Sequence, residues 1–423
     1  MKVRRLVVSV AMIALAATAE GGVLPRTLPR IVNGTLDWQH PTTGALLRST
    51  NSTRTDAFFE CSGTLIGCQT FLTAKHCVVN GAGDAIPASQ FFVYLQHGGI
   101  HHATTIHRDP NADLALVVLG SPVDAISPTP INQASVPQGT SGTIVGFGLP
   151  DGFSSAYGLK RRGMVTVTYA GCPPGEICWL FDDPLGPPGY DSDTCYGDSG
   201  GPLFVQSGIT DVVAGVTTSG TNPDCATPDL SDDQDVSANQ SWILSTGGAD
   251  LANTVCGYGV MVNQPTTTVH GYSGFLDATT TSAVIQDYVP TFMHGYRIGM
   301  NGEDNGATNF NMYVKFGSAP TTTSYDCAST GSTQFQYCDL DGSAPGYWYV
   351  LVKRVKGSGA FQLAATQIPS PQCGNGIREG YEQCDRGPYD TTDCCTSSCT
   401  FEPVGKVCGG GCGRTCDASG VCR

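Results

Sequence analysis

The stretch Gly197-Asp198-Ser199-Gly200-Gly201-Pro202 decides how the first half of this 423-residue chain is interpreted. It stands between a turn-rich segment, residues 186–193, and an apolar run, residues 202–205. Glycines on both sides of Ser199 permit a sharp turn that exposes its hydroxyl. The same turn aims the main-chain N–H groups of Gly197 and Ser199 at one point, as an oxyanion hole requires. Ser199 is therefore a candidate nucleophile, provided that a base lies within reach.

A candidate base and a partner for it precede this turn in the chain. His76 stands out among the eight histidines because it lies in Leu72-Thr73-Ala74-Lys75-His76-Cys77, an apolar strand that ends at a cysteine and would fix the ring. A base of this kind needs a third group to orient it. Asp113 opens an apolar run, where a buried carboxylate needs a partner. Asp109 is the alternative, but it precedes a proline outside that run.

Short apolar or β-branched runs, separated by Gly, Pro, Asn and Asp, predict an all-β fold between Ile31 and about Gly247. A second set of such runs predicts a smaller β-domain further along the chain. Beyond a proline-containing linker at 368–372, 9 of the 19 cysteines fall between Cys373 and Cys422. A segment with so few apolar residues must be held by disulfides. The predicted strands cover residues 91–95, 114–119, 142–147, 164–169 and 212–217, and then 295–300, 310–316, 347–355 and 361–365.

The N-terminal 19 residues predict a secretory signal peptide, because a basic start is followed by an apolar stretch and a small-residue triplet. The stretch is shorter than the ~20 residues of a membrane-spanning helix, and no later one qualifies. We therefore expect a secreted, extracellular protein with paired cysteines that does not span a membrane. A net charge of -14 and a pI near 4.8 argue against nucleic acid as a partner.

Four motifs, taken together and in order, resemble the trypsin-like serine endopeptidases. The resemblance implies that residues 31–247 form two six-stranded antiparallel β-barrels with a catalytic triad in the cleft between them. His76 would be general base and then acid, Asp113 its orienting group and Ser199 the nucleophile. The substrate would be a peptide bond of a protein or peptide, and neither a cofactor nor a metal is expected. The four motifs are Ile31-Val32-Asn33-Gly34, Thr73-Ala74-Lys75-His76-Cys77, Asp113-Leu114-Ala115-Leu116 and residues 197–202.

The Arg30-Ile31 junction gains meaning from this resemblance, since members of the family are made as inactive precursors. Residues 20–30 would be an activation propeptide. Cleavage would free the α-amino group of Ile31, which would pair with the carboxylate of Asp198 and shape the oxyanion hole. Because removing one partner of a buried ion pair is costly, Asp198 is interpreted as an activation switch.

The resemblance also places Asp193, six residues before the nucleophile, at the floor of the specificity pocket. A carboxylate there favours Arg or Lys before the scissile bond. The alternative is a solvated loop acid, because other aspartates lie nearby. Where the family has Ser-Trp-Gly in the pocket wall, this chain has Thr218-Ser219-Gly220, and residues 225–233 are acidic where the family has a Pro-Gly-Val-Tyr type of run. The shape of the pocket is thus left open.

Disulfide pairings implied by the resemblance are Cys61 with Cys77, Cys195 with Cys225 and, in a shortened loop, Cys172 with Cys178. Cys68 and Cys256 are left over and are paired by elimination alone. No CxxC pair with zinc-like spacing occurs in this domain, so no metal site is predicted there.

After a linker at 248–263, residues 264–368 resemble the bacterial pre-peptidase C-terminal domain, a small β-sandwich in which Cys327 would pair with Cys338. Its strand Tyr347-Trp348-Tyr349 could form a binding face, but alternating aromatics favour packing in a core. Residues 373–423 resemble bacterial Cys-rich repeats and, more loosely, disintegrin modules. A surface or matrix ligand is one expected role for these modules, and a protective cap or spacer is the other.

Two hypotheses follow for the whole chain. The first is a secreted endopeptidase that cuts after Arg or Lys and is made as a zymogen. The second is a catalytically silent, secreted binding or adhesion protein on a protease scaffold. An intact nucleophile, base, orienting group, oxyanion-hole glycine and activation site favour the enzyme, because a silent scaffold has no physical need of all five.

Overall fold

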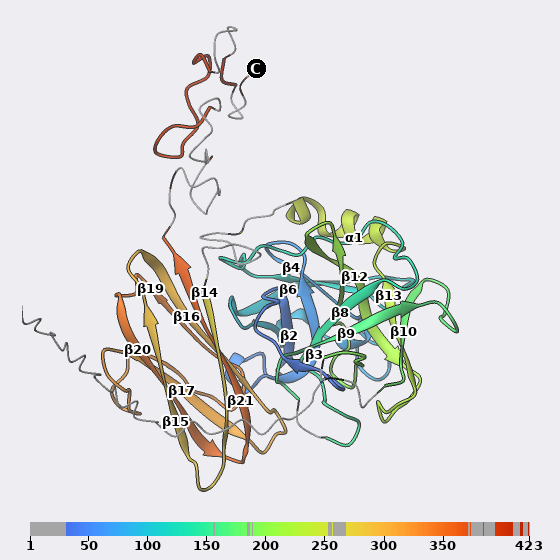
Figure 1. Cartoon of the computed structure of the whole chain (residues 1–423), viewed down its shortest axis with the longest axis horizontal. Helices are drawn as coiled ribbons and strands as arrows, with labels where there is room; N and C mark the ends of the chain where they lie inside the picture. The colour runs from blue at the N-terminus through green and yellow to red at the C-terminus, as the bar shows by residue number, and fades with distance from the viewer. Residues whose placement is uncertain are drawn as a thin grey trace, which may run out of the picture.

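A computed structural model describes residues 31–154, 157–183, 187, 189–252, 256, 268–370, 373, 384, 394–408, 415–417 and 422. The predicted signal peptide and propeptide, residues 1–19 and 20–30, lie outside the described residues. Three packed units of strands follow one another in the chain (Figure 1).

The first unit is a closed barrel of six antiparallel strands in the order β2-β3-β4-β7-β6-β5. Its strands are rich in β-branched and aromatic residues, which suit a pleated surface packed on one side. Phe71, Leu72 and Phe91 are fully buried in its interior. Its strands are β2 (Thr43–Arg48), β3 (Phe58–Leu65), β4 (Thr70–Thr73), β5 (Phe91–Leu95), β6 (Gly99–Arg108) and β7 (Ala115–Leu119), with short 3-10 helices at Arg54–Asp56, Lys75–Val78 and Ala88–Gln90.

The second unit closes in the same way, because β8 pairs with both β9 and β11 in the ring β8-β9-β10-β13-β12-β11. In β9 buried and exposed residues alternate, the pattern of a strand with one face on a core. Trp179, Val165 and Leu203 fill that core. The strands are β8 (Ser141–Gly146), β9 (Arg161–Thr168), β10 (Glu176–Phe181), β11 (Pro202–Ser207), β12 (Thr210–Gly220) and β13 (Asp229–Asp235), and β1 (Thr35–Leu36) pairs with β9.

The predicted double barrel is therefore confirmed. Helix α1 (Gln240–Gly247) follows the second barrel, and its Ile243 is buried in the core of the first. A 3-10 helix at Gly248–Ala252 comes next, and the Cys68–Cys256 disulfide ties the segment after it back to the first barrel. The two barrels are thereby joined by covalent as well as packing contacts.

The third unit is a sandwich of two four-stranded antiparallel sheets, ordered β14-β21-β16-β19 and β15-β20-β17-β18 (Figure 1). Strand β21 runs to Pro369, so the first residues of the predicted linker 368–372 belong to the sheet. The strands are β14 (Thr268–Leu276), β15 (Ser282–Val289), β16 (Met293–Gly302), β17 (Asn309–Phe316), β18 (Cys327–Ser329), β19 (Gln336–Asp341), β20 (Gly346–Lys356) and β21 (Gly359–Pro369).

The aromatic strand of the sandwich divides its side chains between the two faces of its sheet. Trp348 is 5% exposed and packs in the core with Tyr296 and Phe316, whereas Tyr347 is 52% exposed. The prediction that these aromatics pack in a core is correct for Trp348 and wrong for Tyr347, because successive side chains of a strand point to opposite faces.

The sandwich is docked on the barrels through buried polar and aromatic contacts. Asn301, fully buried, accepts a hydrogen bond from Gln96 Nε2 at 2.8 Å and donates one to the carbonyl oxygen of Gly158 at 2.7 Å. The ring of Phe335 lies 5.1 Å from that of Tyr94 and 6.2 Å from that of Phe147. Since buried polar groups are stabilised by hydrogen bonds, the bonds that Asn301 makes to both barrels indicate a specific interface.

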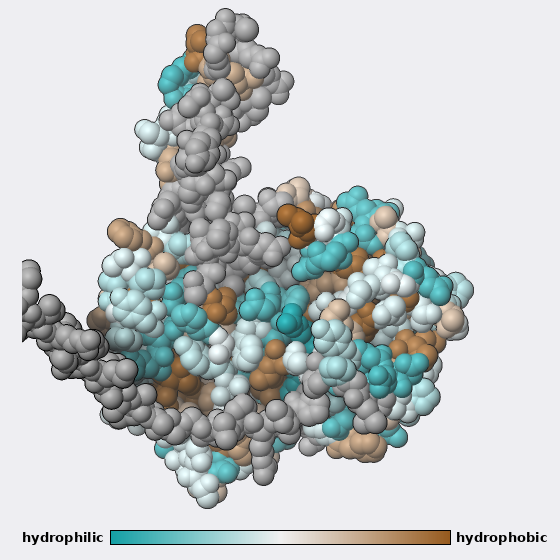
Figure 2. Space-filling model, viewed as in Figure 1, coloured by the Kyte–Doolittle hydropathy of each residue, from teal (hydrophilic) through white to brown (hydrophobic). Residues whose placement is uncertain are grey.

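Nine disulfides join 18 of the 19 cysteines, and the other, Cys412, lies outside the described residues. Four of them fall in the Cys-rich tail, where the hydrophobic cluster among the described residues consists of cysteines. On the face shown in Figure 2, hydrophobic side chains are scattered among hydrophilic ones. In the described part of the chain, no helix has the length and apolar character needed to cross a membrane.

Candidate active site

His76 and Asp113 lie side by side on adjoining turns of the first barrel. The pairing of β4 with β7 ends at Thr73 and Ala115, so the residues beyond these ends are brought together. The main-chain N–H of His76 donates to Asp113 Oδ1 at 2.8 Å, and His76 Nδ1 lies 2.6 Å from Asp113 Oδ2. These two bonds fix the ring, so that its other nitrogen, Nε2, remains for a substrate or nucleophile.

The environment of Asp113 favours its ionised form. Burial alone raises the pKa of this carboxyl, but the hydrogen bonds and charge of His76, with the charge of Lys75, outweigh it and hold the pKa below its usual value. Asp109 forms the turn before it by accepting hydrogen bonds from the N–H groups of Asn111 and Ala112. Asp109 therefore shapes the turn, and Asp113 faces the histidine.

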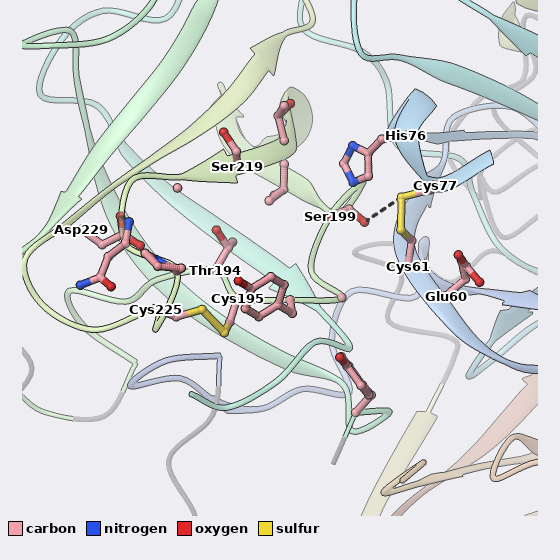
Figure 3. A pocket seen from close by; sticks show the side chains of 18 of the residues that line it. Glu60, Cys61, His76, Cys77, Thr194, Cys195, Ser199, Ser219, Cys225 and Asp229 are labelled. Atoms are coloured by element: carbon pink, nitrogen blue, oxygen red, sulfur yellow. Dashed lines mark hydrogen bonds between the residues drawn. A yellow bond between two sulfur atoms is a disulfide. The ribbon is translucent and has the colours of Figure 1, made fainter. Parts of the chain in front are cut away.

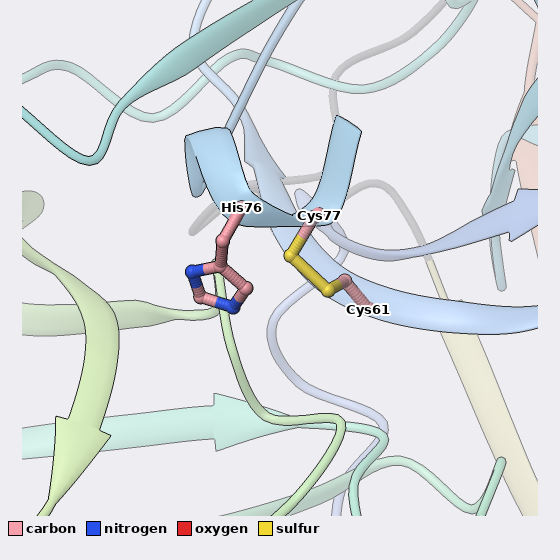
Figure 4. A group of neighbouring side chains, drawn as sticks. All are labelled: Cys61, His76 and Cys77. Carbon is pink, nitrogen blue, oxygen red and sulfur yellow. A yellow bond between two sulfur atoms is a disulfide. The ribbon is translucent and has the colours of Figure 1, made fainter. Parts of the chain in front are cut away.

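His76 does not lie on a strand, as the sequence had predicted, but on the short 3-10 helix Lys75–Val78. Strand β4 ends at Thr73, and the Cys61–Cys77 disulfide holds the helix against β3. Figure 4 shows the His76 ring beside this disulfide. Because both sulfurs are oxidised to a disulfide, they cannot act as thiolate ligands, and the Cys61, His76, Cys77 group does not suit a metal ion.

Ser199 stands in a turn built on two left-handed glycines, Gly197 (φ +91°) and Gly200 (φ +80°). A Cβ at Gly200 would lie 2.1 Å from Thr73 Oγ1, so this position has no room for a side chain. The N–H of Gly200 donates to Thr217 O at 2.8 Å, and Ser62 N–H donates to Ser199 O at 3.0 Å. The turn is thus anchored to both barrels while it carries the candidate nucleophile.

A single cavity of about 700 Å³ brings these groups together between the two barrels. Figure 3 shows Ser199 and His76 at its centre, with Asp229, Thr194 and Cys225 toward one end and Glu60 and Cys61 toward the other. The predicted wall Thr218-Ser219-Gly220, at the end of β12, also lines the cavity. The cleft is therefore open on both sides of the nucleophile.

The end of the cavity beyond Cys195 is lined by Thr194 and the buried Asp229, and Asp193 directly precedes Thr194. Asp193 is fully buried, receives hydrogen bonds from Ser231 Oγ and the N–H of Thr194, and has one carboxylate oxygen, Oδ2, with no hydrogen-bond partner among the described residues. Burial raises the pKa of Asp193 well above its usual value; the hydrogen bond from Ser231 opposes this rise, while the neighbouring Asp229 adds to it. Asp193 is thus a buried acid rather than the solvated loop acid of the alternative.

Asp229 is the site residue that the sequence reasoning missed. It starts β13, lines the cavity and is 2% exposed. Its Oδ1 accepts hydrogen bonds from Thr221 Oγ1 and Asn222 N–H, both at 2.8 Å, and a Cβ at Gly220 would lie 2.9 Å from its Oδ2. The acidic character of residues 225–233 was the available signal. The missing information was which of these acids faces the pocket.

The disulfides near the cleft brace its two ends. Cys195–Cys225 joins the loop before Ser199 to the loop before Asp229, and Cys61–Cys77 holds the histidine turn. Cys172–Cys178, Cys68–Cys256 and Cys327–Cys338 are also formed.

Asp198 is buried beneath the nucleophile turn. Its carboxylate accepts hydrogen bonds from the N–H groups of Gly148 at 2.8 Å and Cys195 at 3.0 Å. Burial raises the pKa of Asp198 to about 7, although these bonds and the charge of Arg161 act in the opposite direction. The carboxyl therefore lies in a place where a cation would stabilise its ionised form.

The segment that starts at Ile31 is buried rather than lying on the surface. Ile31 is 1% exposed and belongs to the core of the second barrel. The main chains of Val32 and Asp193 exchange two hydrogen bonds of 3.1 Å. The first residues after Arg30 are thus held against the loop that leads to the nucleophile turn.

A double barrel with a histidine–aspartate pair, a serine on a glycine turn and an acid at the pocket floor defines the serine protease class. The trypsin family model matches residues 35–243. An alkaline trypsin C of Manduca sexta is 30% identical over 217 residues, which cover 46% of this chain and 83% of that protein. A tryptase of Mus musculus is 30% identical over 197 residues, which cover 40% of this chain and 71% of that protein. The chain belongs to the trypsin family.

Clotting factor C of Tachypleus tridentatus is a further relative, 27% identical over 206 residues. That match covers 40% of this chain and 20% of the clotting factor, so the chain spans about a fifth of that relative's length. The similarity is one of the protease domain.

Proposed function

We propose that this chain is a secreted serine endopeptidase that hydrolyses peptide bonds through an acyl-enzyme. The observation that carries the proposal is that His76, paired with Asp113 at 2.6 Å, lines the same cavity as Ser199. A serine hydroxyl becomes a useful nucleophile only when a positioned base takes its proton.

In this mechanism His76 Nε2 accepts the proton of Ser199 Oγ as the oxygen attacks the scissile carbonyl carbon. Asp113 keeps Nδ1 protonated and stabilises the imidazolium that forms. The N–H groups of Gly197 and Ser199 receive the oxyanion, which the left-handed conformation of Gly197 supports. His76 then gives its proton to the leaving amine, and water, activated by the same ring, releases the acid product.

The preferred residue before the scissile bond is Arg or Lys. The support is Asp229, a buried acid that lines the cavity, together with the buried Asp193, which precedes the lining residue Thr194 and has one carboxylate oxygen without a hydrogen-bond partner among the described residues. A cation entering the pocket would form a charge-assisted hydrogen bond and relieve the repulsion between the two acids. Ionisation of Asp193 would accompany substrate binding.

The chain is made as a zymogen that cleavage at Arg30-Ile31 activates. The burial of Ile31 and the raised pKa of the buried Asp198 carboxyl support this step, since a new α-amino group would supply positive charge that favours the ionised carboxylate. Arg30 itself suits an acidic pocket, so another copy of the enzyme could cut it. The nine disulfides support export into an oxidising compartment.

The domain plan proposed for the chain keeps the protease at 31–247, a pre-peptidase C-terminal-like sandwich at 264–368 and a Cys-rich module at 373–423. The two four-stranded sheets and the four tail disulfides support it. A surface or matrix ligand of these modules is part of the proposal.

The test uses the full chain cleaved at Arg30, a serine-directed fluorophosphonate probe and amides of Arg, Lys, Phe and Ala. We expect labelling of Ser199, hydrolysis of the Arg and Lys amides, and loss of both in Ser199→Ala. Ser207→Ala, an exposed serine on β11, is the matched control and should behave as the wild type. An unlabelled, inactive wild type would instead support a silent binding protein. Cleavage of only Phe or Ala amides would overturn the basic-pocket proposal.

A further inference from the structure

The sandwich reaches the wall of the catalytic cleft at Asp304, in the loop between β16 and β17. Its Oδ2 accepts a hydrogen bond from the N–H of Phe59 at 3.1 Å, and its own N–H donates to the carbonyl oxygen of Tyr157 at 2.9 Å. Phe59 and Tyr157 come from different barrels, on β3 and in the loop before β9, and both line the cavity that contains Ser199. One residue of the third unit therefore joins the two sides of the cleft, with its carboxylate on Phe59 and its main-chain N–H on Tyr157.

Contacts around Asp304 make this a fixed junction. Tyr157 and Asp304 pair as an isolated β-bridge, and a Cβ at Gly158 would lie only 2.4 Å from Gly302 O. The ring of Phe335, another sandwich residue, stacks 6.1 Å from the ring of Phe59. The sandwich thus contacts both the main chain and the ring of Phe59.

The two aromatic rings lie against the nucleophile turn. Their centroids are 5.6 Å apart, and a Cβ at Gly197 would meet Phe59 Cε1 at 2.7 Å and Tyr157 Cδ1 at 2.9 Å. Phe59 directly precedes Glu60 and Cys61 on β3, and these two residues mark the end of the cavity opposite Asp229, with Ser199 between the two ends (Figure 3). If the acid pocket holds the side chain before the scissile bond, this end receives the residues that follow it.

We infer that Asp304 is a positioning residue for the leaving-group side of the cleft: it holds Phe59 and Tyr157 as a wall that accepts an apolar or aromatic side chain just after the scissile bond. The inference rests on the proposed endopeptidase function. It makes the sandwich a part of the substrate site, in addition to any separate ligand that the sandwich binds.

The experiment compares two substrates of the full, Arg30-cleaved protein. One is an internally quenched peptide with Arg before the scissile bond and Phe after it, and the other is an Arg amide of aminomethylcoumarin, which has no residue after the bond. In Asp304→Ala we expect the ratio of the two kcat/KM values, peptide over amide, to fall about tenfold, the effect of losing a buried hydrogen bond to a carboxylate. Asp304→Asn keeps an oxygen acceptor and should restore most of the ratio.

Asp326→Ala is the matched control. Asp326 also accepts a main-chain N–H, from Phe316 at 2.7 Å, and donates its own N–H to Val314 O at 2.8 Å, but within the sandwich alone. Its ratio should stay at the wild-type value. An Asp304→Ala ratio equal to that of Asp326→Ala would overturn the inference, even if both activities fall together.

A second variant, assayed on two peptides, keeps the test decisive if Asp304→Ala does not fold. Tyr157→Ala removes the wall itself, and it should lower the ratio for a peptide with Phe after the bond more than for one with Gly there. An equal effect on both peptides would refute the wall. If the wild type cuts neither substrate, the proposed function fails. If the wild type is active and the ratio of kcat/KM values is unaltered in Asp304→Ala, only the role of Asp304 is overturned.

Discussion

The buried carboxyl of Asp198 predicts that the uncut chain loses stability as the pH rises toward neutrality. Burial raises the pKa of this group from 3.8 to about 7. The folded chain therefore holds the proton more tightly than the unfolded chain does. The stability that the protonated Asp198 carboxyl contributes is present in full below pH 3.8, and it is lost as the pH rises through about 7. A pKa difference of this size between the folded and unfolded chain corresponds to on the order of 4 kcal/mol in the free energy of unfolding.

The assay is urea unfolding of the uncut chain, followed by tryptophan fluorescence over a series of pH values. The variant Asp198→Asn is the reference, because it keeps the shape of the side chain and cannot ionise. We expect the free energy of unfolding of the wild type to fall relative to this variant as the pH rises. Other titrating groups contribute to both proteins and cancel in the difference.

Cleavage at Arg30 should reverse the sign of this dependence. The new α-amino group of Ile31 is positively charged below about pH 8, and a cation beside Asp198 lowers the pKa of the carboxyl. In the cut protein the wild type should then gain stability over Asp198→Asn between acid and neutral pH. A difference that is flat with pH in the uncut chain, or the same before and after cleavage, would refute the assignment of Asp198 as the partner of Ile31.

Three more predictions follow from buried groups. Because Asp193 has a raised pKa and must ionise to bind a cation, the affinity for benzamidine should rise with pH, and its binding should release a proton. Asp229→Asn should move this rise in affinity to lower pH. Calorimetry in two buffers measures the affinity and the proton release, and a pH-independent affinity would contradict the prediction. Phe335→Ala should destabilise the barrels and the sandwich together by about 3–5 kcal/mol, in a single calorimetric transition. Phe292 is 76% exposed, so Phe292→Ala should change the stability little. Two separate transitions, of which Phe335→Ala shifts only one, would disprove the coupling of the units. Lys160→Met leaves buried Asp37 without the amine 3.6 Å away, and it should lower the free energy of unfolding in urea by about 3 kcal/mol. Arg162→Met removes a half-exposed guanidinium 4.0 Å from the same carboxylate, and it should lower that free energy by under about 1 kcal/mol. Equal losses in the two variants would refute this prediction.

The apolar runs of the sequence predicted an all-β fold, and the double barrel was implied by the resemblance of four local motifs to the trypsin-like endopeptidases. Glycines around Ser199 and the apolar runs of the strands fix both the turn and the elements around it. Strand edges were harder to place. The run predicted at 164–169 begins at Arg161 in the structure, since the guanidinium of Arg161 is buried and donates to the carbonyl oxygens of Gly148 and Leu159. A charged residue that is buried by tertiary contacts does not look like part of a strand.

The site shows the same division between local and tertiary information. Ser199, His76 and Asp113 each have a distinctive sequence context, and in the structure Ser199 and His76 line one cavity while Asp113 is hydrogen-bonded to His76. Asp229 has no such context, because it is one of several acids in a row, and only the pairing of β10 with β13 decides that it faces the pocket. Asp304 was equally hidden. A loop aspartate in a separate sandwich has no sequence signal for a contact with β3, since that contact depends on how the units dock.

The loop 193–199 connects several features that would otherwise be independent. In the proposed mechanism it carries the specificity acid Asp193, the brace at Cys195, the switch at Asp198 and the nucleophile at Ser199. The main chain of Asp193 is bonded to Val32, and the carboxylate of Asp198 is bonded to the main chain of Cys195. A change at the Arg30-Ile31 junction can therefore reach the pocket and the oxyanion hole through the hydrogen bonds of this loop. The sandwich acts on the opposite wall of the cleft through Asp304, so activation and leaving-group recognition should respond to different variants.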